Sequence, residues 1–348
     1  MLAQKEKSSS LVLSFEKNGY DPFIDFLKGI CIVLVVITHC LPSVVEKYTL
    51  FHLWGRTAVP IFLIIQVFHA YKHGLIFRLP KITKLWNRIA RPFIITQLAI
   101  AVFLFLFSKN ISVSIYLNKI LDKGYGPGEY YPWIYLQFAL ILPLLSPVIK
   151  KLGKPWKVAL FFILVSQLFE FLCCLINPQE WPFYSRSFFR YFFLIYLGYI
   201  AATTGFSINR KTFLLSLLSL AATIFFVFFN YNLEPFFFKN YQWHYCHWPC
   251  YFYIAYLFIF ILNKFYTIAK THYLSKFIIR AGKYSYEIFL FQMFYFIICG
   301  SHLKKIIGSI TNLNIASGIL FILISILSCV LIPLAFEAIK ERNSQKNK

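Results

Sequence analysis

The stretch from Tyr20 to Cys40, YDPFIDFLKGICIVLVVITHC, decides the fold class of this chain. It is mostly apolar and close to the length, about 20 residues, that an α-helix needs to cross the hydrocarbon core of a bilayer. Asp25 and Lys28 stand inside the run, so it indicates a retained membrane span rather than a cleaved signal peptide. Similar runs recur along the chain, and together they predict an all-α fold: a polytopic membrane helical bundle with about ten transmembrane helices.

The composition excludes the other broad classes. Of 348 residues, 59% are hydrophobic, 20% are aromatic and 14% are charged, whereas an average soluble domain carries about 25% charged residues. The chain is too apolar to be disordered, and it is too long and too poor in cysteine for a secreted disulfide scaffold. A soluble protein of this length could not hide so much apolar surface from water.

The apolar runs divide the chain into three parts. Residues 1–22 form a polar N-terminal segment, residues 23–336 the transmembrane domain and residues 337–348 a charged tail. The ten candidate spans lie at roughly 23–44, 53–71, 89–107, 131–149, 157–176, 188–204, 212–230, 249–266, 284–303 and 314–336.

The excess of basic residues fits this topology. The chain has 35 Lys and Arg against 13 Asp and Glu, a formal charge of +22, which in a soluble protein would suggest nucleic acid as a partner. With the N-terminus in the cytoplasm, ten spans place 24 of the 35 basic residues on the cytoplasmic side and 8 on the other. This bias follows the positive-inside rule. Both termini are therefore expected in the cytoplasm, with membrane lipids and no nucleic acid as partners.

Ionisable residues within the first span are candidates for function, because charge at membrane depth is costly. Asp25 and Lys28 are three residues apart and can pair on one helix face. Lys28 and His39 are eleven residues apart, which places them about 16 Å apart along the helix and on nearly one face. A lone histidine in a span is more often a structural hydrogen-bonding residue than a catalytic one.

Three further ionisable residues are expected near the level of His39. Arg56 lies near the outer end of the second span, Arg190 enters the sixth span from the same side, and Glu170 lies in the fifth. Glu170 could orient His39 in the manner of a catalytic dyad, or it could pair with Arg56 or Arg190. The sequence leaves these alternatives open.

The predicted cytoplasmic loop before the third span is dense in cations. Arg88 and Arg91 stand one helical turn apart, and two guanidinium groups at this spacing could grip a phosphate or diphosphate. The alternative is anchoring by lipid phosphates, which basic residues at this boundary commonly provide.

No metal or nucleotide motif is found. The loop WHYCHWPC holds His244, Cys246, His247 and Cys250, but this spacing is too cramped for the usual paired-ligand zinc patterns, so no metal site is expected. Interfacial aromatics explain the loop better. The sequence also lacks the P-loop, G-x-G-x-x-G, G-x-S-x-G and H-E-x-x-H patterns of ATPases, dinucleotide enzymes, serine hydrolases and zinc proteases.

Several motifs follow one another in a characteristic order. The main ones are DFLKGICIVLVVITH, with Lys28 and His39 in a basic-x10-His spacing, RTAVPIF from Arg56 to Phe62, and RIARP, with Arg88 and Arg91. Weaker ones are YYPWIYL, RYFFLIYLGY and GKYSYEIFLFQ. In this combination the chain resembles the acyltransferase-3 family, the integral-membrane O-acyltransferases that modify bacterial carbohydrates. It departs from the family's patterns at Gln66 and Val67, where a Ser-Gly pair is frequent, and at Phe289 and Gln292, where Tyr and His are common.

The resemblance implies transfer of an acyl group, usually acetyl, from acyl-CoA to a carbohydrate hydroxyl of a cell-surface or exported glycan, at the bacterial inner membrane. It implies His39 as general base, a role that a near-neutral pKa suits. Glu170 is a candidate catalytic partner because of its expected level in the fifth span. Acyl-CoA is then a co-substrate and no cofactor stays bound. The residues expected to bind acyl-CoA or the lipid-linked or free carbohydrate acceptor are Lys28, Arg56, Arg88, Arg91 and Arg190.

Two other functions fit a membrane bundle with intramembrane cations. An exporter of polysaccharide or lipid-linked glycan is one, but such carriers are often built from related halves, and spans one to five show no convincing similarity to spans six to ten. A glycan polymerase or ligase is the other. It would be expected to use a large outer loop, and the longest here, about 23 residues between the third and fourth spans, is modest.

Overall fold

The computed structural model of the protein describes residues 11–13, 20–41, 45–46, 49–74, 79–107, 112, 114, 116–118, 126–176, 186–226, 248–300, 303 and 314–346. These residues are almost entirely helical, and the predicted class, an all-α membrane bundle, is confirmed. The exception within them is a two-stranded antiparallel sheet, in which β1 (Leu11–Leu13) pairs with β2 (Phe206–Ile208).

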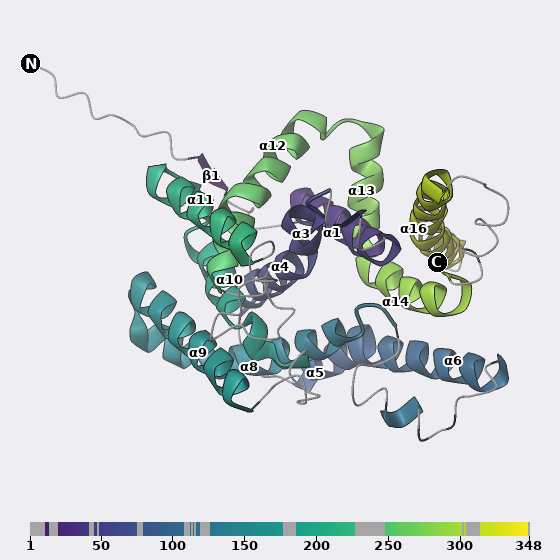
Figure 1. Ribbon diagram of the computed structural model, residues 1–348, viewed down its shortest axis with the longest axis horizontal. Helices are drawn as coiled ribbons and strands as arrows, with labels where there is room; N and C mark the ends of the chain where they lie inside the picture. The colour runs from purple at the N-terminus through teal and green to yellow at the C-terminus, as the bar shows by residue number, and fades with distance from the viewer. Residues whose placement is uncertain are drawn as a thin grey trace, which may run out of the picture.

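The helix that the opening motif predicts, α1 (Pro22–Cys40), lies in the middle of the bundle (Figure 1). Its neighbours are α4 (Ala58–Lys72), α12 (Ile259–Ala269), α13 (Tyr273–Lys283), α14 (Ser285–Tyr295) and α16 (Asn314–Lys346). Of its apolar window, 67% is buried, against 22–33% in the other long apolar helices. The residues of α1 therefore face protein on nearly all sides, so its polar groups lie where they can meet groups from several other helices.

The remaining elements complete the bundle around α1 (Figure 1). They are α3 (Phe51–Trp54), η1 (Gly55–Thr57), α5 (Leu79–Leu85), η2 (Trp86–Ala90), α6 (Arg91–Phe107), α8 (Tyr130–Leu152), α9 (Pro155–Ile176), η4 (Phe188–Tyr191), α10 (Phe193–Thr203), α11 (Arg210–Ile224), η6 (Trp248–Tyr251), η7 (Tyr253–Phe258) and η8 (Phe296–Gly300).

Within the described residues, six helical stretches are long and apolar enough to cross a membrane. They are Pro22–Cys40, Ile82–Phe107, Tyr130–Leu152, Pro155–Cys173, Trp248–Ala269 and Ser317–Gln345. Each of the ten predicted ranges holds a helix over its described part, but the number of spans stays a prediction, as does the side on which the termini lie. The last helix, α16, continues past residue 336, where the transmembrane domain was expected to end.

Outward faces of the bundle are apolar. On α6, Leu98, Val102 and Leu106 follow one another at four-residue spacing and are 57–72% exposed. Four-residue spacing places side chains on one face of a helix. In water such a stripe would be an exposed hydrophobic patch, whereas in a bilayer it meets lipid chains.

Two glycines allow α13 to cross α1 in direct backbone contact. A Cβ atom added to Gly29 of α1 would lie 2.0 Å from the carbonyl oxygen of Ile278, and one added to Gly282 of α13 would lie 1.7 Å from the carbonyl oxygen of Asp25. Any side chain at either position would separate the helices. The sequence predicted no membrane span between residues 266 and 284, because α13 is only 11 residues long and carries basic residues.

Candidate active site

One large cavity runs through the bundle beside α1. Its volume is about 1070 Å³, slightly above the usual range for small-molecule pockets, about 300–1,000 Å³. Both Lys28 and His39 line it, so it extends over about three turns of α1. The cavity is thus long enough to bring a group bound near one end of α1 to the other end.

The end of the cavity near Lys28 is rich in cations. Among the described residues that line the whole cavity, six are Lys or Arg and two are Glu. Four of the six form what we call the cationic mouth: Lys84 of α5, Arg88 of η2, Lys283 of α13 and Lys340 of α16. Charge of this sign favours an anionic ligand such as a phosphate.

Lys28 lies deeper, on α1. Its ammonium group pairs with the carboxylate of Asp25, as the three-residue spacing predicted. Only 25% of the Lys28 side chain and 8% of the Asp25 side chain are exposed. A buried charge needs such a partner, so the aspartate holds the lysine in place within the bundle. His69 of α4 and His73, which directly follows α4, line the same end, with their rings stacked 5.9 Å apart.

The opposite end holds His39 and Arg56, and we call it the histidine end. Both side chains line the cavity, and the Arg56 guanidinium is close enough to act electrostatically on the imidazole. Among the described residues, His39 makes no hydrogen bond; the Thr38 hydroxyl beside it donates instead to the Leu34 carbonyl. The imidazole is therefore available to accept a proton from a bound group.

The carboxylate that pairs with Arg56 is Glu46. The Arg56 Nε donates to Glu46 Oε1 at 2.7 Å, and Nη2 lies 2.6 Å from the same oxygen. Glu46 does not line the cavity and stands behind Arg56. The sequence carried a signal for this pair. The chain has only 13 Asp and Glu, and one of them stands close to the outer end of the first predicted span, where a carboxylate needs a basic partner.

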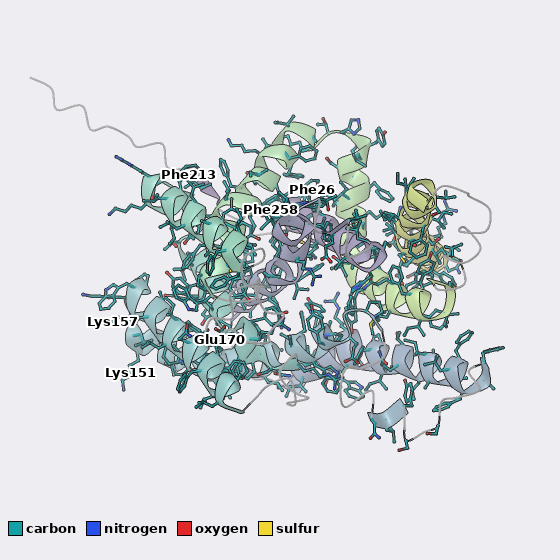
Figure 2. The ribbon with its side chains drawn as sticks, viewed as in Figure 1. Phe26, Lys151, Lys157, Glu170, Phe213 and Phe258 are labelled. Carbon is teal, nitrogen blue, oxygen red and sulfur yellow. The ribbon has the colours of Figure 1, made fainter. Side chains whose placement is uncertain are left out.

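Glu170 lies elsewhere. It is buried on α9, in the part of the bundle that α8 and α9 form (Figure 2). It is not among the residues that line the cavity, and no hydrogen bond joins it to His39. The structure thus does not bring together the two members of the dyad that the sequence left as one alternative.

The structure also separates the arginines expected to bind substrate. Arg88 lines the cavity, whereas Arg91, the first residue of α6, is exposed and does not. Arg190 does not line it either, but stacks on its neighbour Tyr191, with its guanidinium carbon 5.5 Å from the ring centre. Tyr191 does line the cavity.

Some of the residues at which the sequence departs from the family's patterns line the cavity, and others lie outside it. Gln66 and Phe289 line the cavity, and Phe289 packs against Tyr131 with ring centres 5.6 Å apart. Gln292 is buried outside the cavity and donates from Nε2 to the Pro127 carbonyl at 3.5 Å. Phe289 thus contributes apolar surface where the family commonly has a tyrosine.

A second buried ion pair was missed by sequence reasoning. Arg186 Nη2 lies 2.6 Å from Glu129 Oε1, and both side chains are at most 8% exposed. Nearby, the Gln137 amide donates to the Arg186 carbonyl and accepts from the Phe188 N–H. These contacts attach the segment before η4 to the start of α8. Neither Glu129 nor Arg186 lines the cavity, although Gly128 and Tyr130 on either side of Glu129 do.

No metal centre is visible in the described part of the chain, where no three His, Cys, Asp or Glu side chains gather as ligands. His244, Cys246 and His247 of the loop WHYCHWPC lie outside the described residues.

Comparison with known proteins gives one match. A family model described as an acyltransferase domain matches residues 21–335. No curated protein and no solved structure matches the chain.

Proposed function

Because this multi-pass membrane protein belongs to the acyltransferase-3 family, whose model covers residues 21–335, we propose that it transfers an acyl group from acyl-CoA to a carbohydrate hydroxyl. The acyl group is acetyl, and the acceptor is part of a cell-surface or exported glycan. The membrane is the bacterial inner membrane, with the cationic mouth open to the cytoplasm, where coenzyme A is found and where the positive-inside rule puts most Lys and Arg.

The observation that carries this proposal is the single cavity that joins the cationic mouth to His39. Coenzyme A is anionic at its nucleotide end and carries its thioester at the far end of a long, uncharged pantetheine arm. A cation-rich mouth, a cavity wall with Phe62, Tyr131 and Phe289, and an imidazole at the other end match this order of groups.

At the histidine end, His39 acts as general base. The imidazole takes the proton from the acceptor hydroxyl while the hydroxyl oxygen attacks the thioester carbonyl. The carbonyl oxygen becomes an oxyanion, which N–H groups of Arg56 stabilise. The C–S bond then breaks, the thiolate takes the proton back from the imidazolium, and the products are an O-acyl sugar and coenzyme A.

The test is donor dependence. The purified protein in lipid vesicles is incubated with acetyl-CoA labelled in the acetyl group and with glycan extracted from the source cells. The account predicts label in the glycan fraction and an equal amount of released coenzyme A thiol. An exporter, polymerase or ligase would have no need of the thioester, so absence of label transfer would contradict the proposal.

A further inference from the structure

The cationic mouth has two walls. Arg88 stands on η2, whereas Lys283 and Lys340 come from α13 and α16. A hydrogen bond fixes the walls to each other, because the Tyr286 hydroxyl at the start of α14 donates to the Ile89 carbonyl at 2.7 Å. Lys283 is three residues before Tyr286, and Arg88 directly precedes Ile89. The mouth therefore presents cations to a ligand from two sides.

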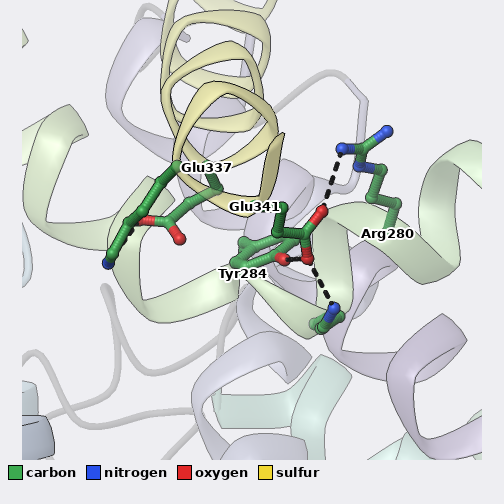
Figure 3. Close-up of polar contacts among 6 residues, drawn as sticks. Arg280, Tyr284, Glu337 and Glu341 are labelled. Atoms are coloured by element: carbon green, nitrogen blue, oxygen red, sulfur yellow. Dashed lines mark hydrogen bonds and ion pairs between the residues drawn. The ribbon is translucent and has the colours of Figure 1, made fainter. Parts of the chain in front are cut away.

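Carboxylates of α16 pair with both Lys283 and Lys340 (Figure 3). Lys283 Nζ lies 3.0 Å from Glu341 Oε1, and the Tyr284 hydroxyl donates to the same carboxylate. Arg280 approaches its other oxygen at 3.7 Å. Lys340 Nζ lies 3.4 Å from Glu337 Oε1.

These contacts are open to solvent and therefore exchangeable. The side chains of Lys283 and Glu341 are 56% and 44% exposed, and that of Lys340 is 76% exposed. Exposed ion pairs contribute little to stability, so a stronger anion can replace the carboxylate. Hydrogen bonding to Tyr284, and then to Glu341, raises the pKa of Lys283 above its usual value, so this lysine stays cationic at neutral pH.

Two carboxylates, one of them the Glu337 that pairs with Lys340, belong to the mouth itself. Glu287 and Glu337 line the cavity, and Glu287 interacts electrostatically with Arg88 and Lys340 as well as with Glu337. They partly compensate the cations of both walls. The site therefore favours a ligand whose charge at the rim exceeds that of one carboxylate. A phosphate monoester, with a charge of about −1.5 to −2 at pH 7, meets this condition.

Coenzyme A carries two separate phosphate groups. The diphosphate lies between the pantetheine arm and the ribose, and the 3′-phosphate, a monoester, lies on the ribose, farther from the thioester. With the thioester at His39, the diphosphate falls near Arg88 and Lys28, and the 3′-phosphate falls at the rim. We propose that Lys283 and Lys340 bind this 3′-phosphate and that it displaces Glu341 from Lys283. This inference rests on the proposed acyl-CoA donor.

The experiment compares the binding of coenzyme A with that of dephospho-coenzyme A, which lacks only the 3′-phosphate. Isothermal titration calorimetry on the purified full-length protein gives both dissociation constants. Each exposed ion pair strengthens binding by up to about fivefold. With two lysines on the 3′-phosphate, the wild type is expected to bind coenzyme A about tenfold more tightly than dephospho-coenzyme A. Lys283→Met is expected to lower this preference to about two- to threefold without weakening dephospho-coenzyme A.

Two more variants separate binding from structure. Glu341→Gln is expected to tighten coenzyme A two- to fivefold and to leave dephospho-coenzyme A unchanged, which a merely structural loss would not do. Arg280→Met is the matched control, because Arg280 also contacts Glu341 but does not line the cavity. It should keep the wild-type preference or raise it.

The outcomes are distinguishable. If the wild type binds both ligands equally, or if Lys283→Met keeps the full preference for coenzyme A, the proposed 3′-phosphate site is wrong. The proposal that acyl-CoA is the donor is not contradicted by that result. If Arg280→Met lowers the preference as much as Lys283→Met does, the effect is structural and the inference is overturned. If the wild type binds neither ligand, the donor in the proposed function is itself wrong.

Discussion

Lys28 and His39 line the same cavity from one face of α1, eleven residues apart. One helix therefore reaches from the cation-rich half of the cavity to the imidazole, and its pitch fixes their separation at about 16 Å. This relationship orders the other groups: phosphate-binding cations belong with Lys28, and groups that act on the reacting atoms belong with His39.

The pair of Arg56 and Glu46 predicts a specific effect on catalysis. In Glu46→Gln the amide oxygen can still accept a hydrogen bond from Arg56, but the negative charge that pairs with two of its nitrogens is lost, so the guanidinium is held less firmly beside His39. Glu46→Gln should lower kcat about tenfold, within the range for losing one oriented donor in an active site, and leave the KM for acyl-CoA unchanged. Steady-state kinetics with labelled acetyl-CoA measures both.

Glu129→Gln is the control for Glu46→Gln. Glu129 also holds an arginine at 2.6 Å, but this pair does not line the cavity. Glu129→Gln should lower the unfolding temperature and leave kcat per folded molecule unchanged. Equal losses of kcat in both variants would show that Glu46 has only a structural role.

Substitutions of Arg88 and Arg91 should differ in their effect on the KM for acyl-CoA, although both arginines belong to one sequence motif. Arg88 lines the cavity and Arg91 does not. Because a hydrogen bond to a charged group contributes about 1.5–3 kcal/mol, Arg88→Gln should raise the KM for acyl-CoA about tenfold or more. Arg91→Gln should change it less than twofold. A larger effect at Arg91 would place the donor phosphates outside the cationic mouth.

The crossing of α1 and α13 predicts a strong effect on stability. Gly29→Ala puts a methyl group 2.0 Å from the Ile278 carbonyl oxygen, so the helices must separate. Overpacking of this kind costs about 1–3 kcal/mol or more, and the unfolding temperature in detergent should fall accordingly. Gly318→Ala is the control, because an added Cβ there meets no atom within 4 Å. A similar fall in both variants would contradict the tight crossing.

Features that depend on one helix could be predicted from the sequence. The helical class follows from apolar runs long enough to span a bilayer, and the Asp25–Lys28 pair follows from helical spacing. His39 and Lys28 were placed relative to each other by the same geometry, and both line the cavity.

Features that depend on two segments could not be predicted in the same way. Arg56 pairs with Glu46, which lies ten residues earlier and is not part of the same helix, so helix spacing gives no distance between them. Glu170 was placed by its depth in a span, but depth does not say which way a side chain faces around the bundle. The α13 helix was missed because its close fit against α1 depends on Gly29 and Gly282 meeting in space, and a short basic segment carries no membrane signal.

The most direct test of the account compares His39→Gln with His69→Gln. Both histidines line the cavity, but His69 lies toward the Lys28 end. Transfer of label from acetyl-CoA and binding of coenzyme A are measured on each purified variant. The account predicts that His39→Gln binds coenzyme A like the wild type and loses transfer by at least about 100-fold, the lower end of the contribution of a general base, while His69→Gln retains transfer. Wild-type transfer by His39→Gln would contradict the central claim that His39 is the base.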